Sequence, residues 1–280
     1  MKKIISLVLC LSLMMGLCLF STSCGEEEDT VLTVATSTGF APFEMVDNGI
    51  YSGIDMEIAA GLAKYLGYDL KIEDMKFEAV VTSVQQGNCD IGMAGLTITP
   101  AREKVVTFSD PYYSANQVLV VPANNTEFDA CKNADEVVAI LNKKTDACKI
   151  GCQAGTTGSI YIEGDSDDPN GYGFAGLAVT KREYDYAALA FTDMVNGQID
   201  YVIVDNAPAE AISKSFEGQV KVINIPLSEE SYAFCVNSDN PDLLKKVNEY
   251  LKKIKADGTF DDICNNYFGD GTPAEIESID

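Results

Sequence analysis

The sequence predicts an α/β protein whose sheets are mainly parallel, and two observations support this prediction. From residue 31 onward, short apolar segments rich in β-branched residues alternate with segments whose apolar residues recur at helical spacing. In addition, QQGNCDIGMAGL (85–96) and VNGQIDYVIVDN (195–206) share the order helix end, glycine, aspartate and apolar strand. This internal repetition is the pattern expected of two similar lobes.

The elements of the first half can be assigned in chain order. VLTVAT (31–36) is a short β-rich segment, and YDLKIED (68–74) alternates like a half-buried strand. Between them, GIDMEIAAGLAKYLG predicts a helix closed by Gly67, because these apolar residues recur at helical spacing: Ile54, Ile58, Leu62 and Leu66. FEAVVTSVQQG (77–87) predicts a second helix, and CDIGMAGL (89–96) a second apolar strand.

The second half repeats this order. KIGCQA (149–154), DYAALAFTDMVNG (185–197) and IDYVIVD (199–205) read as strand, helix and strand. Aligning the glycines and aspartates of the two repeated segments puts Gly95 opposite Asp205, each at the exit of a strand. Ligands of such sheets bind at the carboxyl ends of strands. Asp90 and Asp200 lie at strand starts and are interpreted as capping or loop residues.

Composition indicates a globular protein and disfavours nucleic acid as a partner. The 280 residues carry a formal charge of −23, contain no histidine and are 46% hydrophobic, which suffices for two lobes. An acidic field repels phosphate. The one basic cluster, LLKKVNEYLKKIK (243–255), reads better as an amphipathic core helix because its apolar residues share one face: Leu243, Leu244, Val247, Leu251 and Ile254.

Residues 1–23 have the build of a secretory signal peptide: a short basic start, an apolar run and small residues before Cys24. A transmembrane anchor is the competing interpretation, but the run is ~17 residues, at the short edge of what spans a bilayer. STSC resembles a bacterial lipobox in which Cys24 is lipidated, although Ser21 stands where that motif usually has leucine. Residues 24–30 would then tether the domain to the membrane, and plain secretion is the alternative.

Six cysteines remain beyond Cys24, and their even number in an exported chain permits disulfides. Cys131 with Cys148 or Cys152 is the local candidate, while free thiols fit equally well. Paired C-x-x-C spacing and histidine are both missing, so we expect no metal site.

Several blocks together resemble the polar amino-acid solute-binding proteins of ABC importers, the bacterial extracellular solute-binding proteins of family 3. In order, the similar blocks are FAPFE, GIDMEIAAGLAKYL, GLTITPAREKVVTFSDPYY, GTTG, NGQIDYVIVD and DGTFDDICNNYFG, spanning about Val31 to Gly269. The resemblance implies a two-lobed periplasmic-binding-protein-like (type II) fold with two interlobe crossovers, near QVLVVP (117–122) and VINIPLSEESYAF (222–234). Lobe 1 would then comprise 31–119 and the returning 228–280, and lobe 2 would comprise 120–227.

The resemblance also implies a ligand clamp. Arg102 aligns with the arginine that grips the ligand α-carboxylate, and a guanidinium matches a carboxylate bidentately. Gly95 and Thr97 match positions that meet the α-ammonium and carboxylate, Thr157 would add a backbone donor, and Asp205 matches the acid that binds the α-ammonium. The alternatives are a surface salt bridge of Arg102 with Glu103 or Asp110, and an N-cap role for Asp205.

The residues around the ligand side chain follow from the same resemblance. Phe40 and Phe77 align with positions that sandwich that side chain, and ordinary core packing is their alternative role. Ser37 stands where lysine- and histidine-binding relatives carry aspartate, and Gln153 aligns with a position that contacts the side chain. The expected ligand is therefore a neutral polar amino acid. A basic amino acid paired with Glu44 is the alternative, and a solvent-facing Glu44 is equally compatible with the sequence.

The expected function is that of a lipid-anchored extracytoplasmic receptor that closes on a free L-amino acid and delivers it to a membrane ABC permease. We expect a monomer without a cofactor and without catalysis. The rival class is an enzyme on the same fold, such as a dehydratase, but the missing histidine removes the commonest general base. The segment YIEGDSDDPNGYGFAGLAVT (161–180) predicts a surface excursion because of its turn-forming residues.

Overall fold

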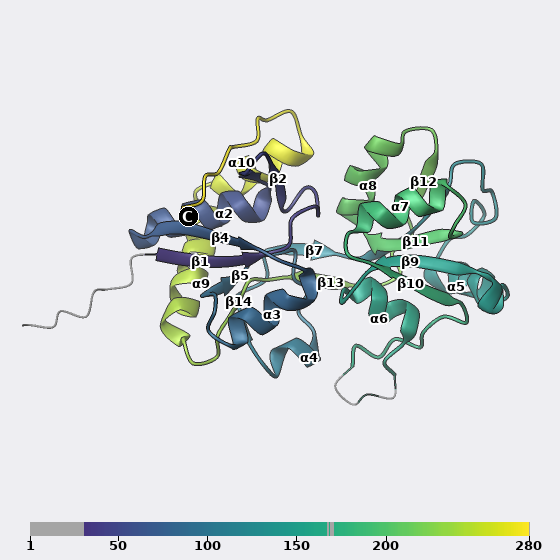
Figure 1. Ribbon diagram of the computed structural model, residues 1–280, viewed down its shortest axis with the longest axis horizontal. Coiled ribbons are helices and arrows are strands. Elements are labelled where there is room, and N and C mark those ends of the chain that lie inside the picture. The colour runs from purple at the N-terminus through teal and green to yellow at the C-terminus, as the bar shows by residue number, and fades with distance from the viewer. Residues whose placement is uncertain (1–30, 167, 169–170, 280) are drawn as a thin grey trace, which may run out of the picture. The chain divides into compact units, whose positions relative to one another are not determined.

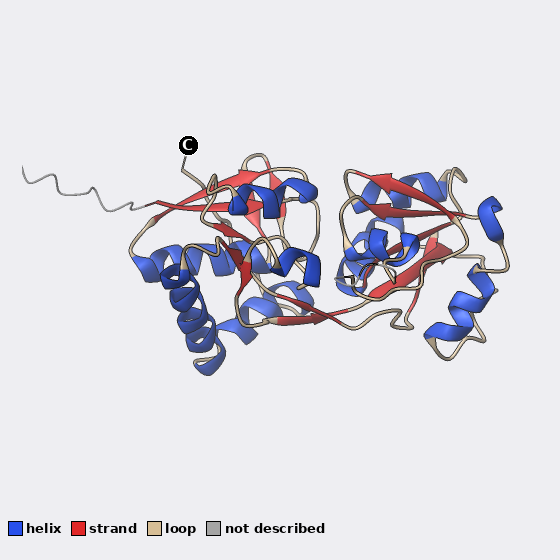
Figure 2. Cartoon of the chain, turned by 90° about the horizontal axis from the view of Figure 1, so that it is seen from below, coloured by secondary structure: helices blue, strands red, loops and turns tan. Residues whose placement is uncertain are grey.

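The computed structural model describes residues 31–166, 168 and 171–279. The predicted signal peptide, Cys24 and the tether lie outside these residues. Within them the strands form two five-stranded sheets and two strand pairs, with helices packed on the sheets (Figures 1 and 2). In this part of the chain no helix combines the length and apolarity that crossing a bilayer requires.

The first sheet has the order β4 (Asp69–Asp74), β1 (Val31–Thr36), β5 (Ile91–Gly92), β14 (Cys235–Val236) and β6 (Thr107–Phe108). Strand β1 runs parallel to β4 and β5, whereas β14 runs antiparallel to β5 and β6. The second sheet has the order β10 (Thr180–Tyr184), β9 (Lys149–Gln153), β11 (Tyr201–Asp205), β8 (Gln117–Pro122) and β12 (Val220–Ile223). Here β9 is parallel to β10 and β11, and β8 is antiparallel to β11 and β12.

Both sheets are therefore mixed rather than mainly parallel. The strand–helix–strand units predicted from the sequence do form the parallel pairs. The antiparallel strands come from segments outside those units, whose partners local periodicity does not reveal. QVLVVP, expected near a crossover, forms β8 inside the second sheet. The elements that pair between the two sheets are β7 (Tyr113–Ala115) and β13 (Glu230–Tyr232), which we call the crossover pair.

The helices begin and end near the predicted bounds. Helix α2 (Ile54–Leu66) ends at Gly67, whose φ of 76° is the left-handed conformation typical of a glycine C-cap. Helices α3 (Phe77–Gln85), α7 (Ala187–Val195) and α8 (Asn206–Ser213) follow the strands as expected. Helix α9 (Pro241–Ala256) buries its apolar face and packs with α10 (Thr259–Phe268) against α2, so the C-terminal helices return to the first sheet (Figure 1).

Helices cover both faces of the second sheet, and alternate strand residues face them. Along β8, Val118 and Val120 pack in the cluster that includes residues of α7 and α8, whereas Leu119 and Val121 pack with those of α5 (Ala134–Leu141) and α6 (Thr157–Glu163). The smaller elements are the hairpin β2 (Met45–Asp47) with β3 (Ile50–Ser52), the helix α4 (Pro100–Glu103), and the turns η1 (Thr145–Ala147) and η2 (Lys214–Phe216).

The aspartates of the repeated segments play the predicted structural role at strand starts. The amide of Thr33, in β1, donates to Asp90 Oδ2 at 2.7 Å. At the equivalent place in the second sheet, the amide of Lys149 donates to Asp200 Oδ2 at 2.8 Å. The repetition seen in the sequence thus reflects the same local construction in both sheets.

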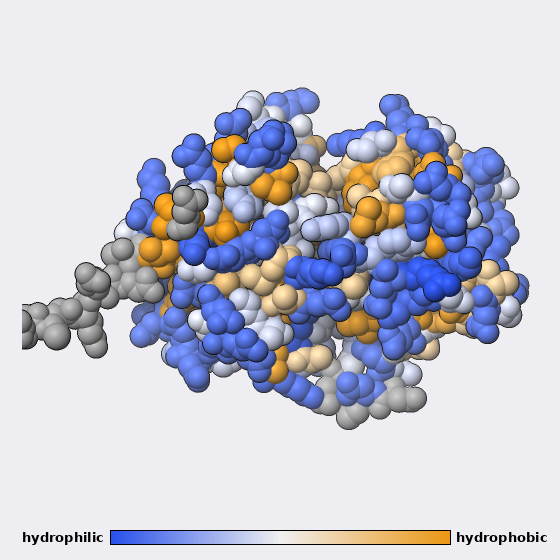
Figure 3. All heavy atoms as spheres, in the orientation of Figure 1, coloured by the Kyte–Doolittle hydropathy of each residue, from blue (hydrophilic) through white to orange (hydrophobic). Residues whose placement is uncertain are grey.

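The six cysteines within the described residues are free thiols. The local disulfide candidate between Cys131 and Cys148 or Cys152 is therefore not formed in this structure. Burial raises the pKa of Cys148 to about 11 and that of Cys152 to about 12, so both remain protonated at neutral pH. Hydrophilic residues cover most of the face seen in Figure 3, with apolar residues in small groups between them.

Candidate functional site

A small cavity between the two lobes brings most of the predicted site residues together. It is lined by Phe40, Phe77, Gly95, Thr97, Arg102, Thr156, Thr157 and Asp205. Of these eight residues, only Thr156 was not among the sequence candidates. Ser37, Glu44 and Gln153, which were candidates, do not belong to this lining.

Arg102 is placed by the four-residue helix α4. Thr99 is the N-cap of this helix, and its hydroxyl accepts a hydrogen bond from the Arg102 amide at 3.2 Å. The guanidinium donates through Nη1 to the carbonyl of Thr97 at 2.6 Å and through Nη2 to the carbonyl of Gly155, across the cleft, at 3.1 Å. Its carbon atom Cζ lies 5.2 Å from the ring centroid of Phe77.

The alternative role of Arg102 as a surface salt bridge does not describe this geometry. Among the described residues, no ion pair joins Arg102 to Glu103 or Asp110. Desolvation lowers the pKa of Arg102, but an arginine still stays charged near neutral pH. A charged guanidinium that donates hydrogen bonds to neutral carbonyls can form stronger ones to an incoming carboxylate.

Gly95 closes the cavity next to Phe40. Its φ of 53° lies in the left-handed region, and a Cβ atom there would stand 3.0 Å from the Phe40 ring, so both backbone and space favour glycine. The Gly95 amide donates to Asp55 Oδ2 at 2.9 Å, and the Tyr112 hydroxyl donates to Asp55 Oδ1 at 2.6 Å. Burial raises the pKa of Asp55 to about 7. The Gly95 N–H is thus occupied, and any backbone contact of Gly95 with a ligand would use its carbonyl.

Asp205 stands at the end of β11 and at the N-cap position of α8, but its side chain makes no capping bond. Instead, its Oδ1 atom accepts a hydrogen bond from the Tyr232 hydroxyl at 2.6 Å. Burial, followed by the nearby charge of Glu230, raises the pKa of Asp205 to about 7. The carboxyl group is therefore directed to the interior beside the crossover pair and not to the start of the helix.

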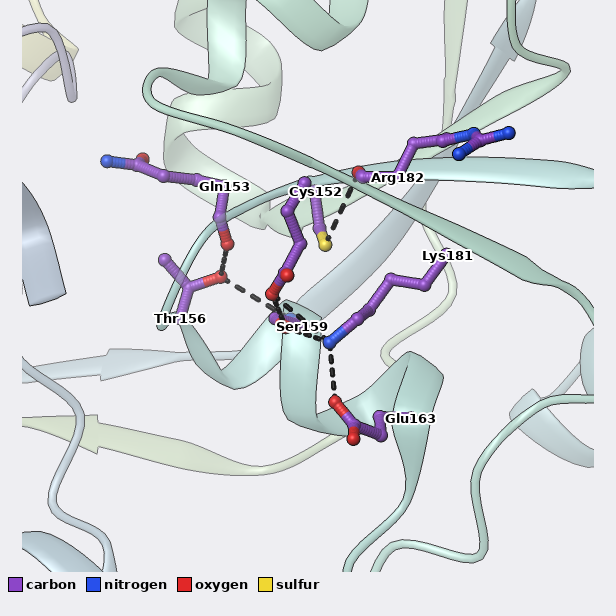
Figure 4. A network of polar contacts seen from close by, with 8 residues as sticks. Cys152, Gln153, Thr156, Ser159, Glu163, Lys181 and Arg182 are labelled. Carbon is purple, nitrogen blue, oxygen red and sulfur yellow. Dashed lines mark hydrogen bonds and ion pairs between the residues drawn. The ribbon is translucent and has the colours of Figure 1, made fainter.

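Thr157 is the first residue of α6, and Thr156 is its N-cap. Figure 4 shows how polar contacts support this turn: the Thr156 hydroxyl donates to the Gln153 carbonyl at 2.8 Å, and Lys181 contacts both Ser159 and Glu163. The side chain of Gln153 is directed away from this network (Figure 4). It is buried, so it remains a candidate for contact with a polar ligand group.

Three buried polar groups near the end of β1 lack partners. Glu44 is 0% exposed, and neither carboxyl oxygen has a hydrogen-bond partner, nor do the hydroxyls of Thr36 and Ser37. Burial, with smaller contributions from Asp55 and Asp205, holds the pKa of Glu44 well above its ordinary value. The backbone of Glu44 pairs with that of Phe40, which lines the cavity. Glu44 is thus an interior group, not a solvent-facing acid.

Glu230 is a site residue that the sequence analysis missed. This residue of β13 is 5% exposed, and its carboxylate accepts hydrogen bonds from Thr97 and Thr157, one from each lobe. The available signal was an acidic pair, Glu229 and Glu230, inside the crossover segment 222–234, which has no other charged residue. Among the described residues, no group of three or more His, Cys, Asp or Glu could hold a metal ion.

Comparison with protein families agrees with this geometry. The model of the bacterial extracellular solute-binding proteins, family 3, matches residues 32–270. The chain belongs to this family. Relatives of the chain are named as amino-acid-binding proteins, among them an ABC transporter arginine-binding protein of Escherichia coli.

Relatives within family 3 bind different amino acids. The arginine-binding extracellular protein of Bacillus subtilis is 28% identical over 271 residues, which cover 96% of this chain and 98% of the relative. The L-cystine-binding protein of Escherichia coli is 28% identical over 245 residues, which cover 87% of this chain and 84% of the relative. An ancestral arginine-binding protein has been solved with arginine and with glutamine, and it is 33% identical to this chain. The alignment covers 86% of this chain and 99% of the ancestral protein. The TM-score is 0.73 for the arginine-bound structure and 0.71 for the glutamine-bound one.

Proposed function

We propose that the protein captures one free L-amino acid between its lobes and delivers it to the permease of an ABC importer. The observation that supports this function is that Arg102 and Asp205, from different lobes, line one cavity. A guanidinium and a carboxylate so placed complement the two charges of an amino-acid zwitterion. We assign the α-carboxylate to Arg102 and to the backbone N–H of Thr157, and the α-ammonium to Asp205.

The capture step is closure of the lobes. A ligand held first by Arg102, Phe40 and Phe77 in lobe 1 gains Thr157 and Asp205 only when lobe 2 approaches. The difference in ligand affinity between the two forms drives the closure. Delivery reverses it at the permease.

For the ligand side chain, the sequence favours a neutral polar group because Ser37 replaces an acid. Glu44 supports the second candidate, a cationic side chain. A buried carboxyl without a partner bears a desolvation cost, which pairing with a guanidinium or ammonium would offset. The acids Asp205 and Glu230 also lie close enough to Arg102 to favour its charged form, and burial raises the pKa of two further acids, Glu44 and Asp55. We therefore propose a cationic ligand, with arginine as the first compound to test and glutamine as the neutral alternative.

The test of the clamp is calorimetry of ligand-stripped protein with arginine, glutamine and the other amino acids. Arg102→Ala leaves the ligand carboxylate without its ionic partner in a desolvated cavity, which costs about 2–5 kcal/mol of binding free energy. Arg182→Ala is the matched control, because that arginine is exposed on β10. Equal affinity of wild type and Arg102→Ala would refute the assignment.

A second substitution tests the side-chain pocket. Glu44→Gln keeps the size of the side chain and removes its charge. It should lower the affinity for arginine by about tenfold or more and change the affinity for glutamine by less than about threefold. Glu249→Gln, at an exposed acid of α9, is the control. If the wild-type protein prefers glutamine, serine or cystine, and Glu44→Gln changes nothing, the neutral-ligand alternative is correct.

We also propose that Cys24 carries a lipid, so that the receptor is attached to the outer face of the cell membrane. The proposal rests on the STSC motif after an apolar run, and Cys24 lies outside the described residues. A tether of this kind keeps the captured amino acid close to the permease.

A further inference from the structure

The carboxylate of Glu230 is fully engaged by three hydroxyl groups. Its Oε2 atom accepts hydrogen bonds from Thr97 Oγ1 and Thr157 Oγ1, each at 2.7 Å, and its Oε1 atom accepts one from Ser228 Oγ at 2.6 Å. All four side chains are buried. In the function proposed above, the hydroxyl groups of this cluster have no role.

Glu230 lies behind the ligand cavity and not in its wall. Thr97 and Thr157 line the cavity, whereas Glu230 lines a separate hollow at the crossover pair, together with Asn116 and Ser231. Its position on β13, between the lobes, lets one carboxylate reach a threonine of each. Any effect of Glu230 on a ligand therefore passes through these two threonines.

The number of hydroxyl hydrogens in this cluster limits which hydrogen bonds the two threonines can donate. A carboxylate has no hydrogen to donate, so each threonine must use its only hydroxyl hydrogen on Glu230. The Thr157 hydroxyl also accepts a hydrogen bond from Gln117 Nε2 at 3.1 Å, which leaves the Thr157 backbone N–H as its contribution to a ligand. The Thr97 hydroxyl is different: within the described residues it has no such donor, and its lone pairs are available only as acceptors.

We infer that Glu230 is a positioning residue that makes the Thr97 hydroxyl a hydrogen-bond acceptor toward the ligand. In this way Glu230 helps to fix the orientation of the bound amino acid. With its hydrogen held by Glu230, the Thr97 hydroxyl accepts a hydrogen bond from the ligand α-ammonium beside Asp205 and cannot donate to the carboxylate. The α-carboxylate is thereby directed to Arg102 and the Thr157 N–H. This inference rests on the proposed amino-acid ligand and adds to it the device that orients the zwitterion.

The decisive variant is Glu230→Gln in the full-length protein, measured by calorimetry with arginine and glutamine. The amide group can donate, which lets the Thr97 hydroxyl turn its hydrogen toward the ammonium. Loss of a hydrogen bond to a charged group predicts an affinity about 10- to 100-fold lower. Glu229→Gln is the matched control, because this exposed neighbour contacts Tyr172 through its backbone carbonyl.

A double-mutant cycle separates this role from simple structural support. In a Thr97→Val background the hydroxyl is gone, so Glu230→Gln should weaken binding by less than about threefold. The same full loss in both backgrounds would overturn the inference, as would wild-type affinity in Glu230→Gln. A wild-type protein that binds no amino acid would instead refute the proposed function.

Should Glu230→Gln fail to fold, the two threonines provide an independent test. Thr97→Val and Thr157→Val each remove one hydrogen bond to Glu230, but only Thr97→Val also removes an acceptor for the ligand. We therefore expect Thr97→Val to lower the affinities for arginine and glutamine at least about tenfold more than Thr157→Val does. An equal or reversed order would overturn the inference.

Discussion

At the scale of single residues, the site is a group of buried acids around one arginine. Asp55 and Asp205 both have a pKa raised to about 7, chiefly because burial disfavours their charged forms. Asp55 accepts hydrogen bonds from Gly95 and Tyr112 and does not line the cavity, whereas Asp205 lines it and accepts a hydrogen bond from the Tyr232 hydroxyl. Asp205 is thus the acid whose charge an incoming ammonium can stabilise.

This arrangement predicts pH-dependent binding. The ammonium favours ionised Asp205, so binding lowers its pKa from about 7 and releases a proton below that pH. Affinity should fall as pH drops from about 7 to about 5 and be nearly constant above about 8. Calorimetry in two buffers of different ionisation enthalpy measures the released protons. Measured with glutamine, which brings no second positive charge to Glu44, Asp205→Asn should bind weakly and show little pH dependence. A pH dependence unchanged in that variant would assign the effect to Asp55 or Glu44 instead.

The ligand-free protein should show the opposite trend in stability. An acid with a raised pKa in the folded state binds protons more tightly there than in the unfolded chain, where aspartate ionises near pH 4. The free energy of unfolding contributed by Asp55 and Asp205 is therefore highest below about pH 4 and is lost as pH rises to about 7. Ligand binding at neutral pH compensates for part of this loss.

At the scale of elements, the short helix α4 determines where Arg102 points. Four residues give a helix little intrinsic stability, so its N-cap matters more than in a long helix. Thr99 is 3% exposed and accepts from the Arg102 amide, and Pro100 follows at the first helical position. The sequence TPAR thus contains a cap and a start signal directly before Arg102, the residue to which we assign the ligand carboxylate.

Thr99→Val keeps the shape of the side chain and removes the cap. We expect the free energy of unfolding to fall by about 1 kcal/mol and the affinity for the ligand to decrease, because the turn that holds Arg102 loosens. Thermal unfolding without ligand and calorimetry with arginine measure the two effects. Thr99→Ser retains a capping hydroxyl and should behave like wild type. A stable Thr99→Val variant with full affinity would show that packing alone holds α4.

At the scale of the whole molecule, contacts between the lobes lie around the cavity as well as in it. Lys76, the N-cap residue of α3, forms an exposed ion pair of 2.9 Å with Asp185, just before α7. The ring of Tyr186 lies so close to Gly39 that a Cβ atom there would be 3.3 Å from it. Together with the bond from Arg102 to Gly155, these contacts join the two lobes, and the closure that we propose requires them to break when the lobes open.

The lipid proposal makes a prediction at this same scale. Labelled palmitate fed to producing cells should enter the protein, and Cys24→Ala should abolish the label and release the protein from the membrane fraction. Cys131→Ala is a suitable control, since it removes a partly buried cysteine far from the motif. Label that persists in Cys24→Ala would refute the lipobox assignment and leave plain secretion.

The sequence alone determined the elements whose signals are local. Helix α2 was predictable because its apolar spacing and its closing glycine act within a few residues. Arg102, Asp205 and Thr157 were selected because their short motifs resemble those of the family; each stands beside a strand end or helix start, and their ligand contacts remain predictions. Such features depend on neighbours along the chain, so a single sequence contains them.

Only the tertiary structure decided the features that depend on distant partners. The antiparallel addition of β14 to the first sheet joins segments far apart in the chain, and no periodicity encodes that pairing. Burial of Glu44 was equally invisible, because a lone acid in a turn looks the same whether it faces solvent or the interior. Glu230 is the clearest case: its two threonine partners are 133 and 73 residues away, so its role exists only once the lobes and the crossover pair have assembled.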